Sequence, residues 1–561
     1  MTLICCPIHV DGIAEVDEAL AKARRAVLLG AKLIEWRADV LAEDAAEVAV
    51  RGLETIVREC PVPSVVTIRP TWEGGMFGGS ESHRISVLEA VGVGAAPPRY
   101  IDVELDAYRT SRNRKQKLNL AVDHDAQVRE VQPRLILSSH DFRSRPADLM
   151  QRVAAMAAEP ACAVMKLAWT ARSIRDNLEA FDLLAERAKP AVALCMGEFG
   201  LLSRVLAPKF GGLFTFAALE RGAESAPGQP TIDELRNTYR YERIGRNTRV
   251  FGVIGWPVRH SRGPRLHNAG FDGVDFDGVY LPLPVPAEYE HFKASIGALV
   301  DHPRLDFGGA SVTIPHKEHC VRFVRERGGR VGGLAAALGA ANTIVVEDGA
   351  LSCANTDAPA SVETIARALR RADDRLGGAR IAVLGAGGVA RAVAGGVALA
   401  GGEAVVFARD VAKADRLVGE LAAGLASFDA ERLDPCESSG SAGPIGRAVR
   451  GEISALGCGC FDAFVNCTPV GMSGGPDPDH TPIESLAAAG GADDHVRYDG
   501  VVVMDTVYAP ERTPWLREAA DRGAHCVSGI EMFVRQAERQ FRRWTGQAPP
   551  EGLFDRAARE T

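Results

Sequence analysis

Val383-Leu-Gly-Ala-Gly-Gly-Val-Ala-Arg391 decides the fold of the second half of the chain. It follows the apolar run Arg380–Leu384 and precedes an alanine-rich stretch, so it predicts a strand, a tight turn and a helix. The turn needs Gly385, a phosphate can approach the backbone at Gly387, and the helix N-terminus offers free N–H groups. We expect a dinucleotide site here, although such turns also occur in α/β domains without a ligand. Its residues would be Gly385, Ala386, Gly387, Gly388, Val389 and Ala390.

A chain of 561 residues, with 382 of them before this turn, is long enough for three to four domains. A formal charge of −8 and the lack of a long basic run argue against nucleic-acid binding. No uncharged run reaches the length of a membrane span. The twelve cysteines lack metal-ligand spacing. We therefore expect reduced thiols, no metal and, without a secretion signal, a cytoplasmic location.

Eight short apolar runs, mostly separated by amphipathic stretches such as Val16–Leu29 and Ile174–Ala188, fill the first 220 residues. This alternation indicates parallel strands, and eight units of this size predict a (β/α)8 TIM barrel. The polar segment Arg236–Arg249 is then a linker to a further α/β half, in which Ser438–Ile445 and Ser473–Pro482 are expected surface insertions. The runs are Leu3–Cys6, Leu33–Trp36, Ser64–Ile68, Tyr100–Val103, Arg134–Ser138, Ala163–Leu167, Ala191–Met196 and Gly212–Phe216.

Polar residues stand at the ends of several runs, where a barrel builds its active site. Lys166 lies in an apolar run, and a desolvated amine can form a Schiff base with a ketone. His140 ends the preceding run and suits general acid–base catalysis. Taken singly, the lysine is more often a residue at a strand edge and the histidine more often structural. Other charged residues at run ends are Glu35, Arg37, Arg69 and Glu104.

The first 240 residues resemble type I 3-dehydroquinate dehydratase, in the family's order and spacing. The resemblance implies that Lys166 forms a Schiff base with 3-dehydroquinate and that His140, oriented by Glu73, moves the protons. Arg204 would bind the carboxylate, and the ring hydroxyls would be held by Glu35, Arg37, Arg69, Ser225 and Gln229. The matching segments are Ile34–Asp39, Thr67–Arg69, Glu73–Gly75, Ser139–Phe142, Met165–Leu167, Met196–Arg204 and Ser225–Gln229.

Lys317 and Asp357 stand out among four polar clusters of the second half. An ammonium fixed by a carboxylate could protonate a carbonyl that receives a hydride. A Lys–Asp pair without further context is usually a surface salt bridge worth under about 1 kcal/mol. The four clusters are Ile254–Pro264, Gly309–Lys317, Gly339–Thr343 and Asn355–Asp357.

Together with the glycine turn, Asn466–Met472, Asp505–Pro510 and Met532–Gln536, these clusters resemble shikimate dehydrogenase. The resemblance implies that Lys317 and Asp357 are catalytic and that Thr468 and Met532 contact the cofactor. Residues implied around the substrate are Ser261, Gly263, Ser311, Thr313, Asn342, Tyr508 and Gln536.

The whole chain thus resembles bifunctional dehydratase–dehydrogenase enzymes. The expected domains are a barrel over 1–238, a substrate domain over 249–358 plus 529–555, and a Rossmann domain over 359–528. Small molecules are the expected partners of a monomer or homodimer. A non-catalytic quinate sensor related to fungal repressors, and a chain in which one activity is vestigial, are the weaker alternatives.

Arg409 favours NADP over NAD. It follows the second predicted strand, where NAD sites usually place an acidic residue, and Lys413 could assist it in binding a 2′-phosphate. Asp410 would repel that phosphate if it pointed inward. Ala408 and Asp410 also depart from the family's Asn-Arg-Thr pattern on either side of the arginine.

Gly263 is a departure from the family's Ser-x-Ser motif, which begins here at Ser261. The missing hydroxyl removes a hydrogen bond to the substrate carboxylate worth about 1.5–3 kcal/mol. It also leaves space where quinate carries an extra hydroxyl, and quinate-preferring relatives show glycine there. Thr313 matches shikimate-selective members, and Ser311 replaces an asparagine as in plant-type sequences. We therefore expect shikimate dehydrogenase activity with tolerance for quinate, and a fused quinate dehydrogenase is the alternative.

Overall fold

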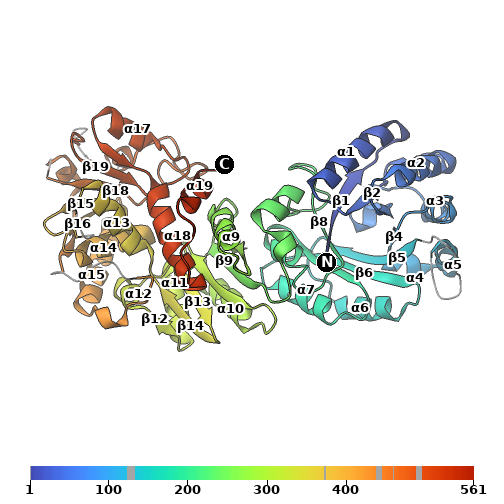
Figure 1. Ribbon diagram of the computed structural model, residues 1–561, viewed down its shortest axis with the longest axis horizontal. Helices are drawn as coiled ribbons and strands as arrows, with labels where there is room; N and C mark the ends of the chain where they lie inside the picture. The colour runs from blue at the N-terminus through green and yellow to red at the C-terminus, as the bar shows by residue number, and fades with distance from the viewer. Residues whose placement is uncertain are drawn as a thin grey trace. The chain divides into compact units, whose positions relative to one another are not determined.

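The computed structural model describes residues 2–122, 133–371, 375–437, 445–458, 460–487 and 496–560, so most of the expected insertion at Ser438–Ile445 lies outside it. The chain forms two compact units, Met1–Thr248 and Arg249–Thr561. Figure 1 shows the helices and strands of both units.

Eight parallel strands form the sheet of the first unit, in the order β7-β6-β5-β4-β3-β2-β1-β8. The N–H of Leu213, next to β8, donates to the carbonyl of Ala191 in β7 at 2.9 Å, which brings the two ends of the sheet together. The predicted TIM-like barrel is confirmed. Its strands are β1 (Leu3–His9), β2 (Leu33–Arg37), β3 (Ser64–Thr67), β4 (Tyr100–Glu104), β5 (Arg134–Asp141), β6 (Cys162–Thr170), β7 (Ala191–Met196) and β8 (Phe214–Phe216).

Helix α1 shows how a barrel helix buries an apolar face. In α1, Val16, Ala19, Leu20 and Ala23 are buried at helical spacing, and the helix ends at Gly30, whose φ of +117° favours glycine. α1 has the predicted bounds, whereas α7 is shorter than the predicted Ile174–Ala188. The helices are α1 (Val16–Leu29), α2 (Ala46–Glu59), α3 (Glu81–Val93), α4 (Leu105–Thr110), α5 (Arg112–Ala121), α6 (Leu149–Ala158), α7 (Asp176–Ala185) and α8 (Leu201–Val205).

The second unit begins with a mixed six-stranded sheet in the order β10-β9-β11-β13-β14-β12, with β13 antiparallel to both neighbours. The strands are β9 (Arg249–Gly255), β10 (Gly278–Pro284), β11 (Phe307–Val312), β12 (Arg330–Val331), β13 (Thr343–Glu347) and β14 (Ala350–Ala354). The associated helices are α9 (Gly263–Gly273), α10 (Tyr289–Asp301), α11 (Lys317–Glu326), α12 (Gly333–Leu338) and α13 (Asp357–Ala368).

A parallel sheet in the order β17-β16-β15-β18-β19-β20 follows. The order reverses beside β15, and a doubly wound sheet binds nucleotides at such a switch point. The predicted Rossmann fold is confirmed. Its strands are β15 (Arg380–Leu384), β16 (Glu403–Phe407), β17 (Arg447–Arg450), β18 (Ala463–Asn466), β19 (Val502–Asp505) and β20 (His525–Val527). Its helices are α14 (Gly388–Leu399), α15 (Val411–Ala426), α16 (Pro482–Ala487) and α17 (Pro514–Asp521).

The last helices, α18 (Gly529–Thr545) and α19 (Leu553–Arg559), return to the mixed sheet. Phe541 and Trp544 of α18 share an apolar cluster with Phe251 of β9, and the Trp544 indole N–H donates to the carbonyl of Ile344 in β13 at 3.0 Å. Figure 1 shows α18 running from the Rossmann sheet toward the mixed sheet. The chain therefore leaves the mixed sheet at α13 and rejoins it at α18.

The expectation of reduced thiols is wrong at Cys460, which is disulfide-bonded, while ten other cysteines are free. Among the described residues, the longest helices lack the length and apolar character needed to cross a bilayer.

Candidate active sites

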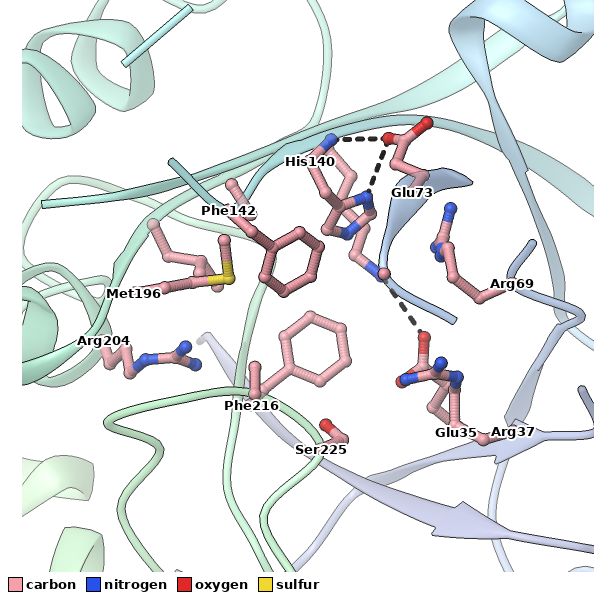
Figure 2. A pocket seen from close by; sticks show the side chains of 15 residues that line it. Glu35, Arg37, Arg69, Glu73, His140, Phe142, Met196, Arg204, Phe216 and Ser225 are labelled. Carbon is pink, nitrogen blue, oxygen red and sulfur yellow. Dashed lines mark hydrogen bonds and ion pairs between the residues drawn. The ribbon is translucent and has the colours of Figure 1, made fainter. Parts of the chain in front are cut away.

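A small cavity of about 50 Å³ lies at the carboxyl ends of the barrel strands (Figure 2). Eight residues singled out from the sequence line it. Gln229 is not in the lining but accepts hydrogen bonds from the backbone N–H and hydroxyl of Ser225, at 3.0 and 3.1 Å. The eight lining residues are Glu35, Arg37, Arg69, Glu73, His140, Lys166, Arg204 and Ser225.

Lys166 comes from β6 and is 4% exposed. Its Nζ lies 2.8 Å from Oδ2 of Asp102 and 3.2 Å from Oε1 of Glu35, and 4.6 Å from the centre of the Phe216 ring. The amine is therefore held at one place by two carboxylates and an aromatic face. A nucleophile fixed in this way meets a ketone in one geometry.

His140 and Glu73 share two hydrogen bonds. Oε1 of Glu73 accepts the backbone N–H of His140 at 2.5 Å and lies 3.1 Å from Nδ1 of its ring. With the proton on Nδ1, this contact fixes the ring and leaves Nε2 as the basic nitrogen. Burial, together with the charges of Arg69 and Lys166, lowers the pKa of His140 well below 6.5. Burial raises the pKa of Glu73 to about 8, against the attraction of Arg69.

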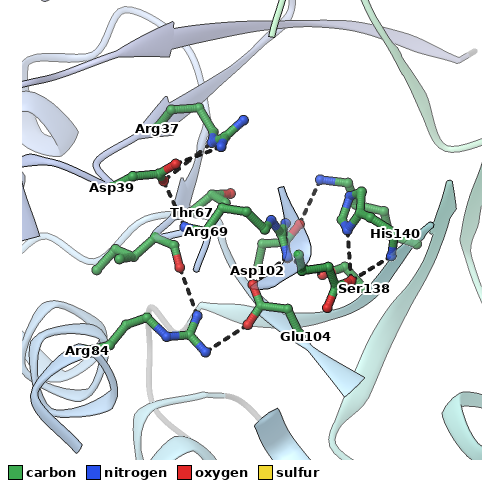
Figure 3. A network of polar contacts seen from close by, with 12 residues as sticks. Arg37, Asp39, Thr67, Arg69, Arg84, Asp102, Glu104, Ser138 and His140 are labelled. Carbon is green, nitrogen blue, oxygen red and sulfur yellow. Dashed lines mark hydrogen bonds and ion pairs between the residues drawn. The ribbon is translucent and has the colours of Figure 1, made fainter. Parts of the chain in front are cut away.

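Asp102 and Glu104 of β4 anchor a buried ionic network (Figure 3). Arg69 reaches Asp102 Oδ1 at 2.7 Å and Glu104 Oε1 at 2.5 Å, and Arg84 reaches Glu104 Oε2 at 2.7 Å. Arg69 Nη1 also donates to the hydroxyl of Ser138 at 2.8 Å. The Nη atoms of Arg69, expected at the substrate hydroxyls, thus already bind protein groups.

Burial alone would raise the pKa of Asp102, but Arg69 and Lys166 outweigh it and hold that pKa well below its usual range. Asp102 is the site residue that the sequence reasoning missed. Its signal was the spacing Asp102-Val-Glu104 inside a strand, which places both carboxyls on one face.

Arg204 lies on α8 and is 1% exposed. Among the described residues, its Nε and Nη2 have no hydrogen-bond partner. Burial lowers its pKa to about 10, so it remains a cation at neutral pH. A buried cation without an acceptor is costly, and the chemistry that would satisfy it is a carboxylate or a similar anion.

Lys317 and Asp357, 40 residues apart, form a buried ion pair with Nζ 2.7 Å from Oδ2. They begin α11 and α13 respectively. Beside them, the side-chain amide of Asn342 donates to Thr356 Oγ1 at 2.9 Å and to Gln536 Oε1 at 3.3 Å. The structure therefore brings together the two residues whose proximity the sequence alone left open, next to two of the expected substrate residues.

Gly263 begins α9, and its N–H donates to Ser261 Oγ at 3.2 Å. A Cβ at this position would lie 3.2 Å from Cε1 and 3.4 Å from the hydroxyl of Tyr280. That hydroxyl donates to Ser311 Oγ at 2.6 Å, and Ser311 in turn donates to Gln540 Oε1 at 2.8 Å. The ring of Tyr280 thus borders the space left by the missing serine, and Ser311 directs its proton at the protein.

Two further expected substrate residues lie in the same unit. Thr313 follows β11, and its N–H donates to the carbonyl of Ile254 at 2.9 Å. Tyr508 stacks on Phe533 with ring centres 4.8 Å apart, and the guanidinium of Arg262 lies 5.9 Å from its ring centre. The Arg262 side chain therefore approaches the ring of Tyr508, an expected substrate residue.

The glycine turn between β15 and α14 lies beside Lys317. Gly385 has a φ of +118°, and a Cβ added to Gly387 would meet no atom within 4 Å, so the backbone is open to a ligand there. A Cβ at Gly388 would lie 3.2 Å from Cδ of Lys317, and one at Gly385 3.0 Å from Cγ2 of Thr468. Met532 is buried at the start of α18, in the core cluster of this sheet. A pyrophosphate fits this turn, and the ion pair adjoins it.

Arg409 is exposed after β16. Asp410 is the N-cap of α15: its Oδ1 accepts the N–H of Lys413 at 3.1 Å, and its Oδ2 lies 3.8 Å from that residue's Nζ. The acid next to Arg409 is therefore occupied in capping a helix. This arrangement leaves Arg409 available for an anionic group.

Sequence profiles of three families match the chain: type I 3-dehydroquinase over residues 4–246, the shikimate dehydrogenase substrate binding domain over 253–344, and the shikimate 5′-dehydrogenase C-terminal domain over 529–559. The chloroplastic bifunctional 3-dehydroquinate dehydratase/shikimate dehydrogenase of Arabidopsis thaliana is 34% identical over 99% of this chain and 83% of that protein. This chain belongs to that bifunctional family.

Two further relatives match about half of this chain or nearly all of it. The NADP(+) shikimate dehydrogenase of Citrifermentans bemidjiense is 36% identical over 55% of this chain and 94% of its own length. A solved structure of dehydroquinate dehydratase and shikimate dehydrogenase from S. pombe AroM covers 99% of this chain and 97% of that one, with 24% identity and a TM-score of 0.39. The matched profiles place a dehydratase domain and dehydrogenase domains in one chain.

Proposed function

We propose that the barrel dehydrates 3-dehydroquinate through a Schiff base on Lys166 and that the second unit reduces the resulting 3-dehydroshikimate to shikimate with NADPH at Lys317 and Asp357. The family accounts for the two activities. One observation carries the residue roles of the barrel: Lys166, the His140–Glu73 pair and the unpartnered Arg204 line one small buried cavity.

In the dehydration, the nitrogen of Lys166 adds to the C3 ketone, and two of the three ammonium protons leave with the ketone oxygen as water, which gives an iminium ion. Nε2 of His140 removes a proton from C2, and the electrons of that bond form an enamine. The same imidazole then protonates the C1 hydroxyl as it departs. Hydrolysis of the remaining iminium returns Lys166 and releases 3-dehydroshikimate, so the net change is the loss of one water. Glu73 holds the imidazole in one orientation throughout.

Arg204 binds the substrate carboxylate, because its two unpartnered nitrogens offer the paired donors that a carboxylate accepts. Glu35, Arg37, Ser225 and Gln229 lie around the ring hydroxyls. Arg69 acts there through Asp102 and Glu104, since its terminal nitrogens are bonded to those carboxylates.

In the reduction, NADPH bound at the glycine turn would supply the hydride that reduces the C3 carbonyl of 3-dehydroshikimate. Lys317 donates a proton from Nζ to the developing alkoxide, and Asp357, 2.7 Å away, fixes the ammonium. Asn342 and Gln536, which are hydrogen-bonded to each other, bind ring hydroxyls. Ser261, Thr313 and Tyr508 complete the substrate site, with Ser311 contributing through Tyr280.

The choice of NADP rests on Arg409 and on the named cofactor of relatives such as the Citrifermentans bemidjiense enzyme. Arg409 and Lys413 would hold the 2′-phosphate, with Thr468 and Met532 beside the glycine turn. We assign the chain to a barrel over 1–238, a substrate domain over 249–358 plus 529–555, and a Rossmann domain over 359–528. The separation between two compact units at 248/249 supports the start of the substrate domain at 249.

The test is one coupled assay followed by chemical trapping. Purified protein given 3-dehydroquinate and NADPH should consume NADPH, and Lys166→Met should abolish this while leaving the reduction of added 3-dehydroshikimate intact. Borohydride reduction with 3-dehydroquinate should add the ligand mass to a peptide containing Lys166. A missing adduct, or a Lys166→Met protein with unchanged dehydratase activity, contradicts the barrel assignment.

A quinate dehydrogenase is the second candidate for the second unit, and Gly263 favours it. The position carries no hydroxyl for the substrate carboxylate, yet the ring of Tyr280 limits the space beside it. We expect shikimate to have the higher kcat/KM and quinate to be oxidised more slowly. Comparing kcat/KM for the two acids decides between them, and a clear preference for quinate overturns the shikimate assignment.

A further inference from the structure

Glu437 is a buried carboxylate that joins the two halves of the second unit. It lies in the connection from α15 to β17, in the Rossmann half, and is 1% exposed. Oε1 accepts the backbone N–H groups of Ala335 at 2.8 Å and Asn355 at 3.0 Å. Oε2 accepts those of Leu334 at 3.1 Å and Asp434 at 3.0 Å. All four donors are main-chain groups, so the carboxylate sets backbone positions.

Three of these four donors belong to the two segments that carry the proposed catalytic and substrate groups. Leu334 and Ala335 form the first turn of α12, which leads into the loop bearing Asn342. Asn355 precedes Asp357 by two residues, and its own side chain accepts the N–H of Ala358 at 3.0 Å. A single side chain from the Rossmann half therefore holds both segments of the substrate half.

Further contacts fasten the segment Asp429–Glu437, here called the strap, to the same half. Arg330 of β12 donates to the carbonyl of Leu433 at 3.2 Å, and Arg543 of α18 donates to Asp434 Oδ1 at 3.1 Å. A Cβ at Gly332 would lie 2.5 Å from Oε2 of Glu437, so the backbone approaches the carboxylate as closely as glycine permits. Figure 1 shows α12 beside α15, the helix from which the strap departs.

We propose that Glu437 is a positioning residue for the dehydrogenase site: it fixes the Asn355–Asp357 turn and α12 relative to the glycine turn of the Rossmann half. The proposal rests on the proposed function, because it assigns the role through Asp357. Lys317, which is paired with Asp357, lies beside Gly388 of the glycine turn across the two halves. A misplacement of about 1 Å between reacting groups can cost roughly 100-fold in rate. Glu437 supplies a charge-assisted bridge across that junction.

The four backbone N–H groups around Glu437 require a carboxylate at this position. Each oxygen accepts two N–H groups, which an amide cannot reproduce, since its NH2 would face two further donors. Glu437→Gln therefore keeps the size of the side chain and breaks one half of the bridge. Gly332→Ala places a methyl group against Oε2 of Glu437 and so displaces the carboxylate without deleting a polar group. Glu431→Gln is the matched control, because this acid is exposed on the same strap.

The experiment uses the full chain and measures kcat for shikimate oxidation per NADPH-binding site, with the number of sites taken from a fluorescence titration. We expect Glu437→Gln and Gly332→Ala to bind NADPH with full stoichiometry and to lose about tenfold or more in kcat per site. The dehydratase activity of both variants should remain at the wild-type level. The Glu431→Gln protein should keep the wild-type kcat per site for shikimate oxidation.

The outcomes separate the two proposals. A wild-type kcat per site in Glu437→Gln overturns the positioning role. This includes the case in which the total activity falls only in proportion to the number of NADPH sites. If Glu437→Gln yields no folded protein, Gly332→Ala decides by the same criteria. A wild-type protein that oxidises no shikimate would instead contradict the proposed function itself.

Discussion

Nζ of Lys166 lies 2.8 Å from Oδ2 of Asp102, and both side chains are buried. Because the pKa of Asp102 is held well below its usual 3.8, the stability that this carboxylate contributes is present above pH 3.8 and is lost as pH falls through the lowered value. At pH 7, Asp102→Asn leaves two cations, Lys166 and Arg69, short of a counterion. We expect the free energy of unfolding of the barrel to fall by about 3–5 kcal/mol in urea titrations. The exposed Asp106→Asn is the control, and an equal loss in both variants would refute this role.

The pH dependence of the dehydratase should reflect the buried His140. Its pKa lies well below 6.5, so the neutral imidazole that accepts the C2 proton persists at mildly acid pH. We expect kcat of the dehydratase reaction to fall on the acid side of the profile only well below pH 6.5. A profile of kcat from pH 4.5 to 9 checks this. An acid limb centred at or above 6.5 would show that the imidazole titrates as it does in water.

Glu73→Gln should be mild at neutral pH. Since burial raises the pKa of Glu73 to about 8, the side chain is protonated and neutral at pH 7, and glutamine can still accept both hydrogen bonds from His140. We expect a loss in kcat of less than about tenfold at pH 7, against about 100-fold or more for Glu73→Ala, which frees the ring. If kcat of the wild-type protein changes with pH near 8, that change should be absent in Glu73→Gln, which has no titratable carboxyl at this position. Equal losses in the two variants would contradict an orienting role.

Arg204→Met separates binding from stability. The guanidinium has two unpartnered nitrogens in the unliganded protein, so it contributes mainly when an anion is bound. We expect the KM for 3-dehydroquinate to rise roughly 30- to 1,000-fold, equivalent to about 2–4 kcal/mol, with a much smaller change in kcat. The unliganded protein should be no less stable than wild type, because no counterion is orphaned. A lower melting temperature without ligand, or an unchanged KM, would count against carboxylate binding.

The strands and the groups at their ends were predictable from the sequence, because parallel strands impose a local pattern. Asp102 was missed, since its partner Lys166 is 64 residues away and no local spacing joins them. The Lys317–Asp357 contact likewise depends on how α11 and α13 begin at one sheet edge. Ser311 was expected at the substrate, but its proton is directed at Gln540 on the distant α18. Local patterns fixed which side chains face inward, whereas pairing across elements required the fold.

Cofactor preference should depend on one exposed guanidinium. Arg409 lies at the end of β16, and the neighbouring Asp410 is engaged in capping α15, so the phosphate of NADP would meet a cation without a competing acid. A charge-assisted hydrogen bond contributes about 1.5–3 kcal/mol, so Arg409→Leu should raise the KM for NADP⁺ by roughly 10- to 150-fold and leave that for NAD⁺ unchanged. Arg416→Leu, an exposed arginine on α15, is the control. Because Arg409 is exposed, added salt should weaken the wild-type preference and leave the variant unaffected. Kinetics with both cofactors at low and high ionic strength test this, and a variant that keeps the full NADP preference would assign the phosphate site elsewhere.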